Sequence, residues 1–328
     1  MSRATARLTV VLLGLLLAFA LSVFVRTSSV RTLWGNAAVS SLAWSPDGET
    51  LAIGSADGSI LLWDMALNRH RQTMNVQSDV ISLAWSPDSR MIASGIYSDT
   101  DLGTITVWDI DSGESIRTIG IATPKLRSLS WSPDGMVLSA GLQERLVLFW
   151  DVGLDAVQEV EGFSDEILNI AFSPDGQLLA VGQQDGFITF MDPANRDPAQ
   201  RVSYSSHDYV ADLGWSPDGQ ILASATCFTE ASLPAQCRLV LWNPSNEQYQ
   251  ASFPGTDYDF TSVAWAPSGK YIASAFLNGD VALYNPDTGS RVRTFQTPVG
   301  STLVTWSPDG QTLAAGSEDG SVLLWSIH

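Results

Sequence analysis

One short phrase returns along this chain at an interval of about forty residues. It reads LAWSPDG where it first occurs, at Leu42, and it recurs six times with small changes. The later copies begin at Leu83, Leu129, Ile170, Leu213, Val263 and Val304. Their aromatic residues, from Trp44 to Trp306, are spaced by 41, 46, 41, 43, 50 and 41 residues. A period of this length is typical of repeat architectures, in which each repeat is one supersecondary unit.

Each repeat predicts four antiparallel strands joined by short links. In the first repeat, residues 41–44 alternate as in a half-buried strand, and the SPDG that follows has the composition of a turn. Residues 50–55 and 60–64 predict two further strands joined by an Asp-Gly hairpin, and residues 69–74 predict a looser outer strand. One such sheet cannot bury both of its faces, so we expect seven sheets packed around an axis.

The repeated pattern xLAxSPDGxxLAxGSxDGxIxLWD resembles the WD40 repeat, over residues 29–328. The resemblance implies an all-β fold, a seven-bladed β-propeller of four-stranded antiparallel blades. The Gly-His pair that usually opens a WD40 repeat is absent. Ser55, Asp57 and Trp63 therefore lack the histidine of the family's hydrogen-bonded tetrad. The SPDG signature also fits TolB-like propellers, which are the competing family.

The last repeat ends one strand short, and the beginning of the chain contains a matching segment. VRTL at residues 30–33 lies as far before Trp44 as VRTF at residues 292–295 lies before Trp306. This shared register predicts that the segment around Arg31 and Trp34 is the outer strand of the last blade. The propeller is accordingly expected to occupy residues 28–328 and to be closed by an N-terminal strand.

A hydrophobic segment precedes the repeats. Residues 8–25 contain no charge and follow Arg3 and Arg7, and as a helix they are long enough to span a bilayer. We expect residues 1–27 to be a signal anchor or transmembrane helix, although small residues at 18–20 also fit a cleaved signal peptide. The flanking charges favour a propeller outside the cytoplasm, held by a single-pass anchor, or secreted if the segment is cleaved.

The charge balance of the chain is strongly acidic, with 35 acidic and 17 basic residues and a net charge of -18. Such a surface repels phosphate backbones and anionic lipids, so we expect no nucleic-acid partner and no membrane contact beyond the N-terminal segment. The three histidines, His70, His207 and His328, do not have the spacing of metal ligands. No metal, cofactor or catalytic residue is predicted, and the repeated SPD aspartates are interpreted as turn residues.

The two cysteines lie in the second hairpin of the fifth repeat, which is longer than the corresponding hairpin of the first repeat. Because antiparallel neighbours can bring two sulfurs into range, a Cys227–Cys237 disulfide is predicted, with two free buried thiols as the alternative. A disulfide would agree with an exported domain.

Two functions remain open from the sequence. The first is a non-catalytic protein-interaction scaffold, and the second is a propeller hydrolase or lyase with a loop-borne active site. An axial pocket lined by several acids with shifted pKa values would favour the enzyme.

In WD40-like propellers the links between repeats share one rim with the second hairpins, which here carry the two largest insertions, at residues 98–103 and 227–237. Loops that vary on a rigid scaffold are typical binding sites, and tyrosine is a good anchor for a partner. The residues predicted on these links to bind a polar or cationic protein partner are Asp79, Asp165, Asp208, Tyr209, Asp257 and Tyr258.

Overall fold

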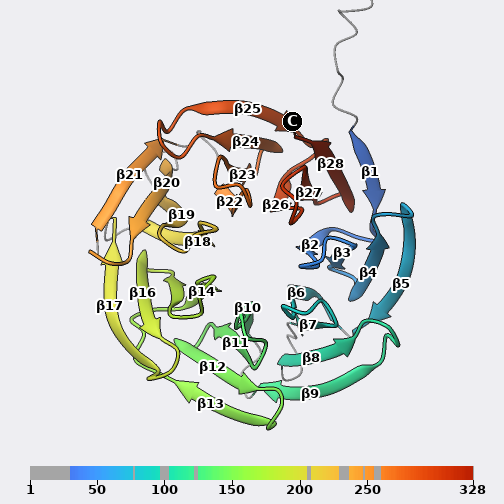
Figure 1. The fold of residues 1–328 in the computed structure, drawn as a ribbon, viewed down its shortest axis with the longest axis horizontal. Coiled ribbons are helices and arrows are strands. Elements are labelled where there is room, and N and C mark those ends of the chain that lie inside the picture. Colours follow the sequence, from blue (N-terminus) through green and yellow to red (C-terminus); the bar gives the residue numbers. More distant parts are fainter. Residues whose placement is uncertain are drawn as a thin grey trace, which may run out of the picture.

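The computed structural model of the chain describes residues 30–76, 78–96, 103–121, 125–204, 208–228, 236–246, 248–254 and 260–327. In this part of the chain, seven four-stranded antiparallel sheets stand as blades around a central axis (Figure 1). The all-β, seven-bladed propeller predicted from the sequence is therefore confirmed. The predicted N-terminal helix and the domain boundary at residue 27 lie outside the described residues.

Each blade runs from an inner strand at the axis to an outer strand at the edge. Blade 1 contains β2 (Val39–Trp44), β3 (Thr50–Ser55), β4 (Ser59–Asp64) and β5 (Arg69–Asn75). Blade 2 contains β6 (Val80–Trp85), β7 (Met91–Ile96), β8 (Gly103–Asp109) and β9 (Ser115–Ile121). Blade 3 contains β10 (Leu126–Trp131), β11 (Val137–Leu142), β12 (Leu146–Asp151) and β13 (Ala156–Val160).

The remaining blades repeat this order. Blade 4 contains β14 (Ile167–Phe172), β15 (Leu179–Gln183), β16 (Phe187–Asp192) and β17 (Asp197–Ser203). Blade 5 contains β18 (Asp208–Trp215), β19 (Leu222–Phe228), β20 (Gln236–Asn243) and β21 (Gln248–Pro254). Blade 6 contains β22 (Phe260–Trp265), β23 (Ile272–Phe276), β24 (Asp280–Tyr284) and β25 (Arg291–Gln296). Blade 7 contains β26 (Ser301–Trp306), β27 (Thr312–Ser317), β28 (Ser321–Ser326) and, as its outer strand, β1 (Arg31–Trp34).

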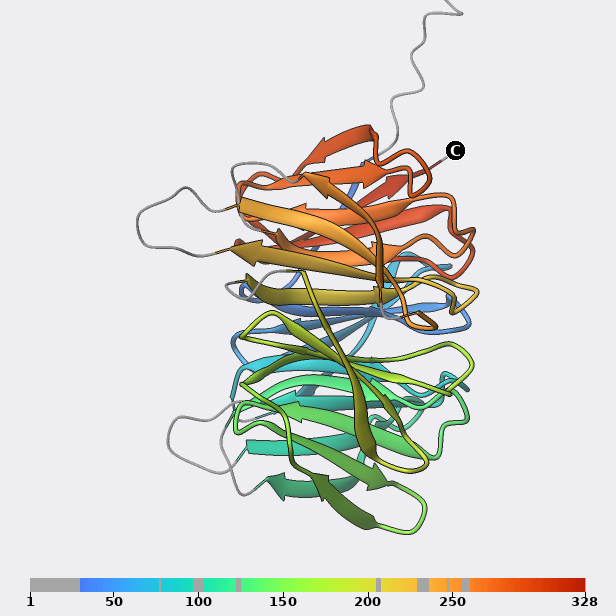
Figure 2. The same cartoon turned by 90° about the vertical axis from the view of Figure 1, so that its left-hand side faces the viewer.

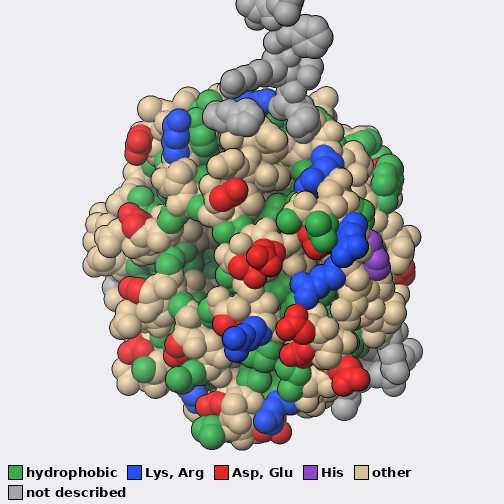
Figure 3. Space-filling model, turned by 45° about the vertical axis from the view of Figure 1, so that its right-hand side comes forward, with side chains coloured by type: hydrophobic (Ala, Val, Ile, Leu, Met, Phe, Trp, Pro, Cys, Tyr) green, Lys and Arg blue, Asp and Glu red, His purple; other side chains and the backbone are tan. Residues whose placement is uncertain are grey.

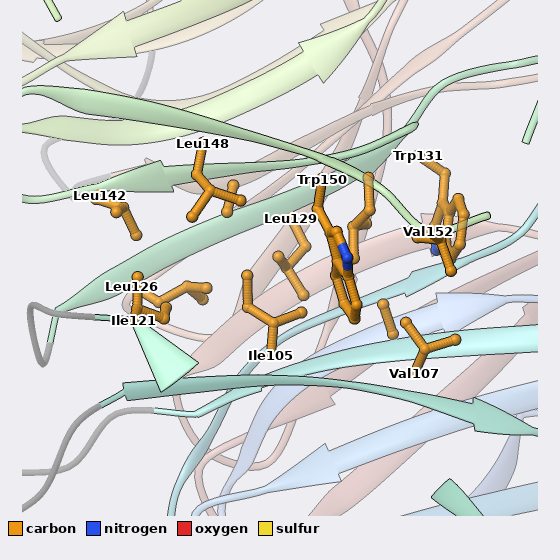
Figure 4. Packing of buried hydrophobic residues seen from close by; sticks show 13 residues of the cluster. Ile105, Val107, Ile121, Leu126, Leu129, Trp131, Leu142, Leu148, Trp150 and Val152 are labelled. Carbon is orange, nitrogen blue, oxygen red and sulfur yellow. The ribbon is translucent and has the colours of Figure 1, made fainter. Parts of the chain in front are cut away.

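The hydrophobic core lies between the blades. Blades 2 and 3, for example, bury Ile105 and Val107 against Leu129, Trp131 and Trp150 (Figure 4). The second strand of a blade approaches the next blade so closely that a glycine is required in several repeats. A Cβ added to Gly141 would lie 2.7 Å from Cγ2 of Ile167 in blade 4. The same position holds Gly54, Gly95, Gly182 and Gly316, where an added Cβ would lie 2.5–2.7 Å from the following blade.

The two rims of the ring differ because successive connections in an antiparallel blade alternate between its ends. The first-to-second and third-to-fourth strand turns form one rim, called the turn rim. The second-to-third strand turns and the links between blades form the other, called the loop rim. Figure 2 shows the strands running between the two rims. The strands that flank the sequence insertions, β7 with β8 and β19 with β20, open toward the loop rim, as predicted.

The second aromatic residue of the repeats forms no complete tetrad in blade 1. The indole of Trp63 donates to Asn68 Oδ1 at 3.4 Å, and the buried Ser55 hydroxyl has no hydrogen-bond partner in the protein. In blades 2 and 5 the indole instead donates to a serine of the neighbouring strand, from Trp108 to Ser94 and from Trp242 to Ser224. The missing histidine thus changes local hydrogen bonding while the propeller still forms.

The ring closes in the predicted way. β1 pairs antiparallel with β28, with Arg31 opposite Leu324 and Trp34 opposite Ser321. Leu33 is buried, with 2% of its surface exposed, in a cluster that includes Leu51 of blade 1. The N-terminal strand therefore covers an edge of blade 7 that would otherwise expose unpaired backbone groups.

Replacing Leu33 with alanine should lower the free energy of unfolding by about 2–4 kcal/mol, because a buried leucine loses its contacts and leaves a cavity. Urea unfolding followed by tryptophan fluorescence measures this loss. The matched control is Thr32→Ala, an exposed neighbour on the same strand, which should change the stability by no more than about 0.5 kcal/mol. Equal losses in the two variants would contradict the described closure.

Candidate functional site

The turn rim is built from one repeated hydrogen-bond network. In blade 1 the Ser45 hydroxyl donates to Asp47 Oδ1 at 2.5 Å, and the backbone N–H of Glu49 donates to the same oxygen at 2.9 Å. The corresponding serine donates to the corresponding aspartate in blades 2, 3, 4, 5 and 7. These bonds to the charged form lower the pKa of Asp134, for which the Ser132 hydroxyl is the largest cause. The repeated aspartates therefore hold turns, as the sequence predicts.

The loop rim carries the predicted partner-binding residues in several environments. Asp79 is exposed, and Asp165 is half-buried with its Oδ1 3.6 Å from Nη2 of Arg145 in blade 3. Asp208 is buried at the start of β18, with only 7% of its surface exposed. Its neighbour Tyr209 is half-buried and lines a cavity on the axis of the ring, called the axial channel. The other two predicted residues, Asp257 and Tyr258, lie outside the described residues.

All seven blades contribute to the wall of the axial channel. Its cavity of about 560 Å³ is lined by residues from the inner strands of every blade. Serine, threonine and asparagine side chains make up much of the lining, together with Tyr209 and Gln184. Arg127 is the one basic residue among the described lining residues, and it is exposed in the channel.

Polar side chains around this channel join several of the blades to their neighbours. The hydroxyls of Ser41 and Ser82 accept hydrogen bonds from the backbone N–H groups of Leu83 and Leu129, at 2.8 and 3.0 Å. Ser128 and Ser262 make the same bond to blades 4 and 7, at 3.3 Å. Each of these serines stands three residues before the first aromatic of its repeat. The indoles of Trp85, Trp131, Trp215 and Trp306 add a bond back to a backbone carbonyl of the preceding blade.

Blade 5 has an aspartate at this position of the ring. Oδ1 of Asp212 accepts hydrogen bonds from the Asn169 amide of blade 4 and from Leu213 N–H, both at 2.8 Å. Oδ2 accepts one from Val263 N–H of blade 6 at 2.8 Å, and the Ser262 hydroxyl also bonds to the carboxylate. One carboxylate thus joins three blades. Sequence reasoning overlooked it, although alignment of the repeats on their first aromatic places Asp212 where most repeats have serine.

Burial raises the pKa of Asp212 to about 6, because desolvation of the charged form outweighs the hydrogen bonds that it accepts. A small part of the side chain still faces the channel. The acceptor positions of this carboxylate are occupied by four donors of the protein. Asp212 is also the one acid among the described residues that line the channel, so the channel does not bring several acids together.

The predicted disulfide is present at the loop-rim end of blade 5. Cys227 and Cys237 are bonded to each other and face each other across β19 and β20. Both are buried, and Tyr209 lies opposite Cys227 in the pairing of β18 with β19. The disulfide therefore links β19 to β20 within the hydrophobic cluster against which Tyr209 packs. Within the described residues, no group of three or more His, Cys, Asp or Glu has the arrangement of a metal site.

The seven blades, the recurring aromatic residues and the repeated Ser–Asp turns define a WD40-repeat β-propeller. Residues 27–64 match the sequence model of the WD domain, G-beta repeat. Residues 77–326 match that of the IFT122 first beta-propeller, and the chain belongs to this family. The matches confirm the WD40 resemblance, and propellers of these families are typically non-catalytic scaffolds that bind proteins. No curated protein matches the chain.

The Asp212 carboxyl gives a testable pH dependence. Its pKa is about 6 in the folded protein and 3.8 as the ordinary value, so between these pH values the folded state binds more protons than the unfolded state. Stability contributed by this group is therefore present at low pH and falls as pH rises from about 4 to about 6, by roughly 2–3 kcal/mol. Asp212→Asn cannot titrate and should lose this dependence.

The measurement is urea unfolding of the two proteins at pH 4, 5, 6 and 7. The free energy of unfolding of the original protein minus that of Asp212→Asn should fall across the interval. Asp134→Asn is the control, because the pKa of Asp134 is lowered from 3.8, so its stability contribution changes only at more acid pH and the corresponding difference should stay nearly constant from pH 5 to pH 7. A difference that stays constant for Asp212→Asn would contradict the assigned burial of the charge.

Proposed function

We propose that this chain is a non-catalytic protein-interaction scaffold, attached to a membrane by its N-terminal segment and displayed outside the cytoplasm. The main support for a scaffold function is the difference between the two rims. The turn rim repeats one Ser–Asp network in six blades. The links of the loop rim differ in length and sequence from blade to blade while the strands beneath them stay regular. Variable loops on a rigid support are the usual place for binding.

The partner proposed for the loop rim is a polar or cationic protein. Asp79 offers an exposed carboxylate there, and Asp165 offers a second one that is already paired in part with Arg145. Tyr209 lines the channel and can present its ring to an inserted side chain. Asp208 is buried at the start of β18, and the roles proposed for Asp257 and Tyr258 rest on the sequence.

Two features support the proposed location outside the cytoplasm. Residues 8–25 form an uncharged hydrophobic stretch of sufficient length to span a bilayer. The Cys227–Cys237 disulfide fits an oxidising compartment, since cytoplasmic thiols are generally kept reduced. In the part of the chain that the structure describes, no helix has the length and apolar character that a membrane span requires.

A hydrolase or lyase with an active site at the loop rim is the second candidate. One observation favours it, namely a carboxyl with a raised pKa in the axial cavity, Asp212. The scaffold is the better proposal because the Asp212 carboxylate is occupied by donors from three blades, which is the environment of a structural group.

Removing the two charges of the loop rim should weaken binding to the partner. With the full chain as bait in membrane extracts, we expect Asp79→Asn combined with Asp165→Asn to reduce capture of the partner at low salt by up to about tenfold. The reduction should shrink at high salt, because exposed charges are screened.

Asp134→Asn on the turn rim is the control for this experiment. It should lower stability and leave capture unchanged, since its carboxylate holds a turn. Equal loss of capture in the two proteins, or no loss in the loop-rim variant, would reject this rim as the binding face.

The proposed compartment predicts two results in cells. A C-terminal fusion to a reporter enzyme that is active only outside the cytoplasm should be active. Protein isolated under alkylating conditions, without reductant, should contain no modified thiol at Cys227 or Cys237. An active cytoplasmic reporter at the same position would reject the orientation, and alkylated cysteines would reject the oxidised state in the cell.

A further inference from the structure

Basic side chains gather on the outer strands of three consecutive blades. The outer strands of blades 6, 7 and 1, which are β25, β1 and β5, contain five arginines and no acidic residue. These residues, called the basic arc, are Arg31, Arg69, Arg71, Arg291 and Arg293. The outer strands of blades 2 to 5 contain two arginines and two acids instead. The charge of the edge is therefore uneven, although the whole chain carries -18.

The basic arc is accessible, and exposed apolar side chains accompany it. Four of its arginines are exposed, and Arg31 is half-buried. Arg71 forms an ion pair with Asp111 of blade 2, in which Nη2 lies 3.0 Å from Oδ1. Figure 3 shows blue basic side chains on this side of the molecule, with red acidic side chains among them. The apolar side chains on the same edge are Val30, Trp34 and Val292, which are 51%, 61% and 52% exposed.

The length of the tether places this edge near the membrane, if the membrane attachment proposed above holds. Only residues 26–29 separate the hydrophobic stretch from Val30, where the described chain begins. Even a fully extended chain from residue 25 to residue 30 spans no more than about 18 Å. β1, at the centre of the basic arc, is therefore the part of the propeller that cannot move far from the bilayer surface.

We propose that the propeller stands on its edge against anionic lipid headgroups, with the basic arc of blades 6, 7 and 1 facing the membrane. The short connection to the hydrophobic stretch keeps the propeller near the bilayer, and the uneven charge of its edge orients it. Exposed Trp34 and its valine neighbours then lie at the headgroup level, where tryptophan is enriched in membrane proteins. The expectation that the propeller avoids lipids rests on its net charge, which averages over surfaces of opposite character. An edge-on orientation leaves both rims open to partners.

The orientation can be tested by comparing how strongly lipids quench a fluorophore placed on either side of the ring. The full chain is reconstituted into vesicles of phosphatidylcholine with phosphatidylglycerol, and a fluorophore is attached at Thr32→Cys on β1. The matched position is Gln158→Cys on β13 of blade 3, an exposed outer-strand residue far around the ring from β1. A spin-labelled headgroup lipid should quench the label at position 32 several-fold more strongly than the label at position 158. Arg69→Gln with Arg293→Gln, introduced into the Thr32→Cys protein, should reduce this quenching.

The control for the charge change is Arg201→Gln on blade 4. Arg201 lies over the Phe187 ring at 4.3 Å much as Arg293 lies over Phe295 at 4.5 Å, so the control removes a similar ring contact, together with a hydrogen bond from Arg201 to Ser164. This control should leave the quenching at position 32 unchanged. Equal quenching of the two labels on chains that float with the vesicles would overturn the edge-on orientation and leave the membrane attachment standing. Chains that fail to float with the vesicles would overturn the attachment and the orientation together.

Discussion

Each blade of this propeller depends on its neighbours, because a four-stranded sheet with two apolar faces cannot bury either face alone. Side-chain packing between adjacent blades buries those faces, and a small set of hydrogen bonds fixes their spacing. A serine of one inner strand accepts from the backbone of the next, and a tryptophan indole donates back to the preceding blade. Glycine in the second strand allows this close approach. The last interface, between blades 7 and 1, also buries Leu33 of β1, the strand that completes blade 7.

The repeats are most alike at the positions that pack or hold turns, and they differ most in the links of the loop rim. The Ser–Asp network of the turn rim recurs because it satisfies the same backbone groups in each blade. At the channel position that holds serine in four of the repeats, blade 5 has Asp212, which accepts a hydrogen bond from Asn169 of the preceding blade. This aspartate puts a carboxyl with a raised pKa at the interfaces around blade 5. The neighbouring disulfide stiffens the same blade toward the loop rim.

The surface divides into three regions with different properties. The turn rim is regular and held by internal hydrogen bonds, the loop rim is variable, and the edge carries uneven charge. A scaffold of the proposed kind needs one region for attachment and another for partners, and the ring provides them at right angles to each other. The proposed attachment would reach the propeller at its edge, because β1, which closes the ring there, directly follows the N-terminal segment in the sequence.

The sequence by itself determined the fold, the closure of the ring and the disulfide. These follow from local signals that repeat in register, such as the SPDG turns, the paired aromatics and the match of VRTL with VRTF. The environments of the candidate residues were decided only by the tertiary structure. Asp79 and Asp208 have similar positions in their repeats, yet one is exposed and the other buried. The basic arc, the channel and the three-blade contact of Asp212 likewise join residues from different repeats, and their proximity depends on how the blades pack around the axis.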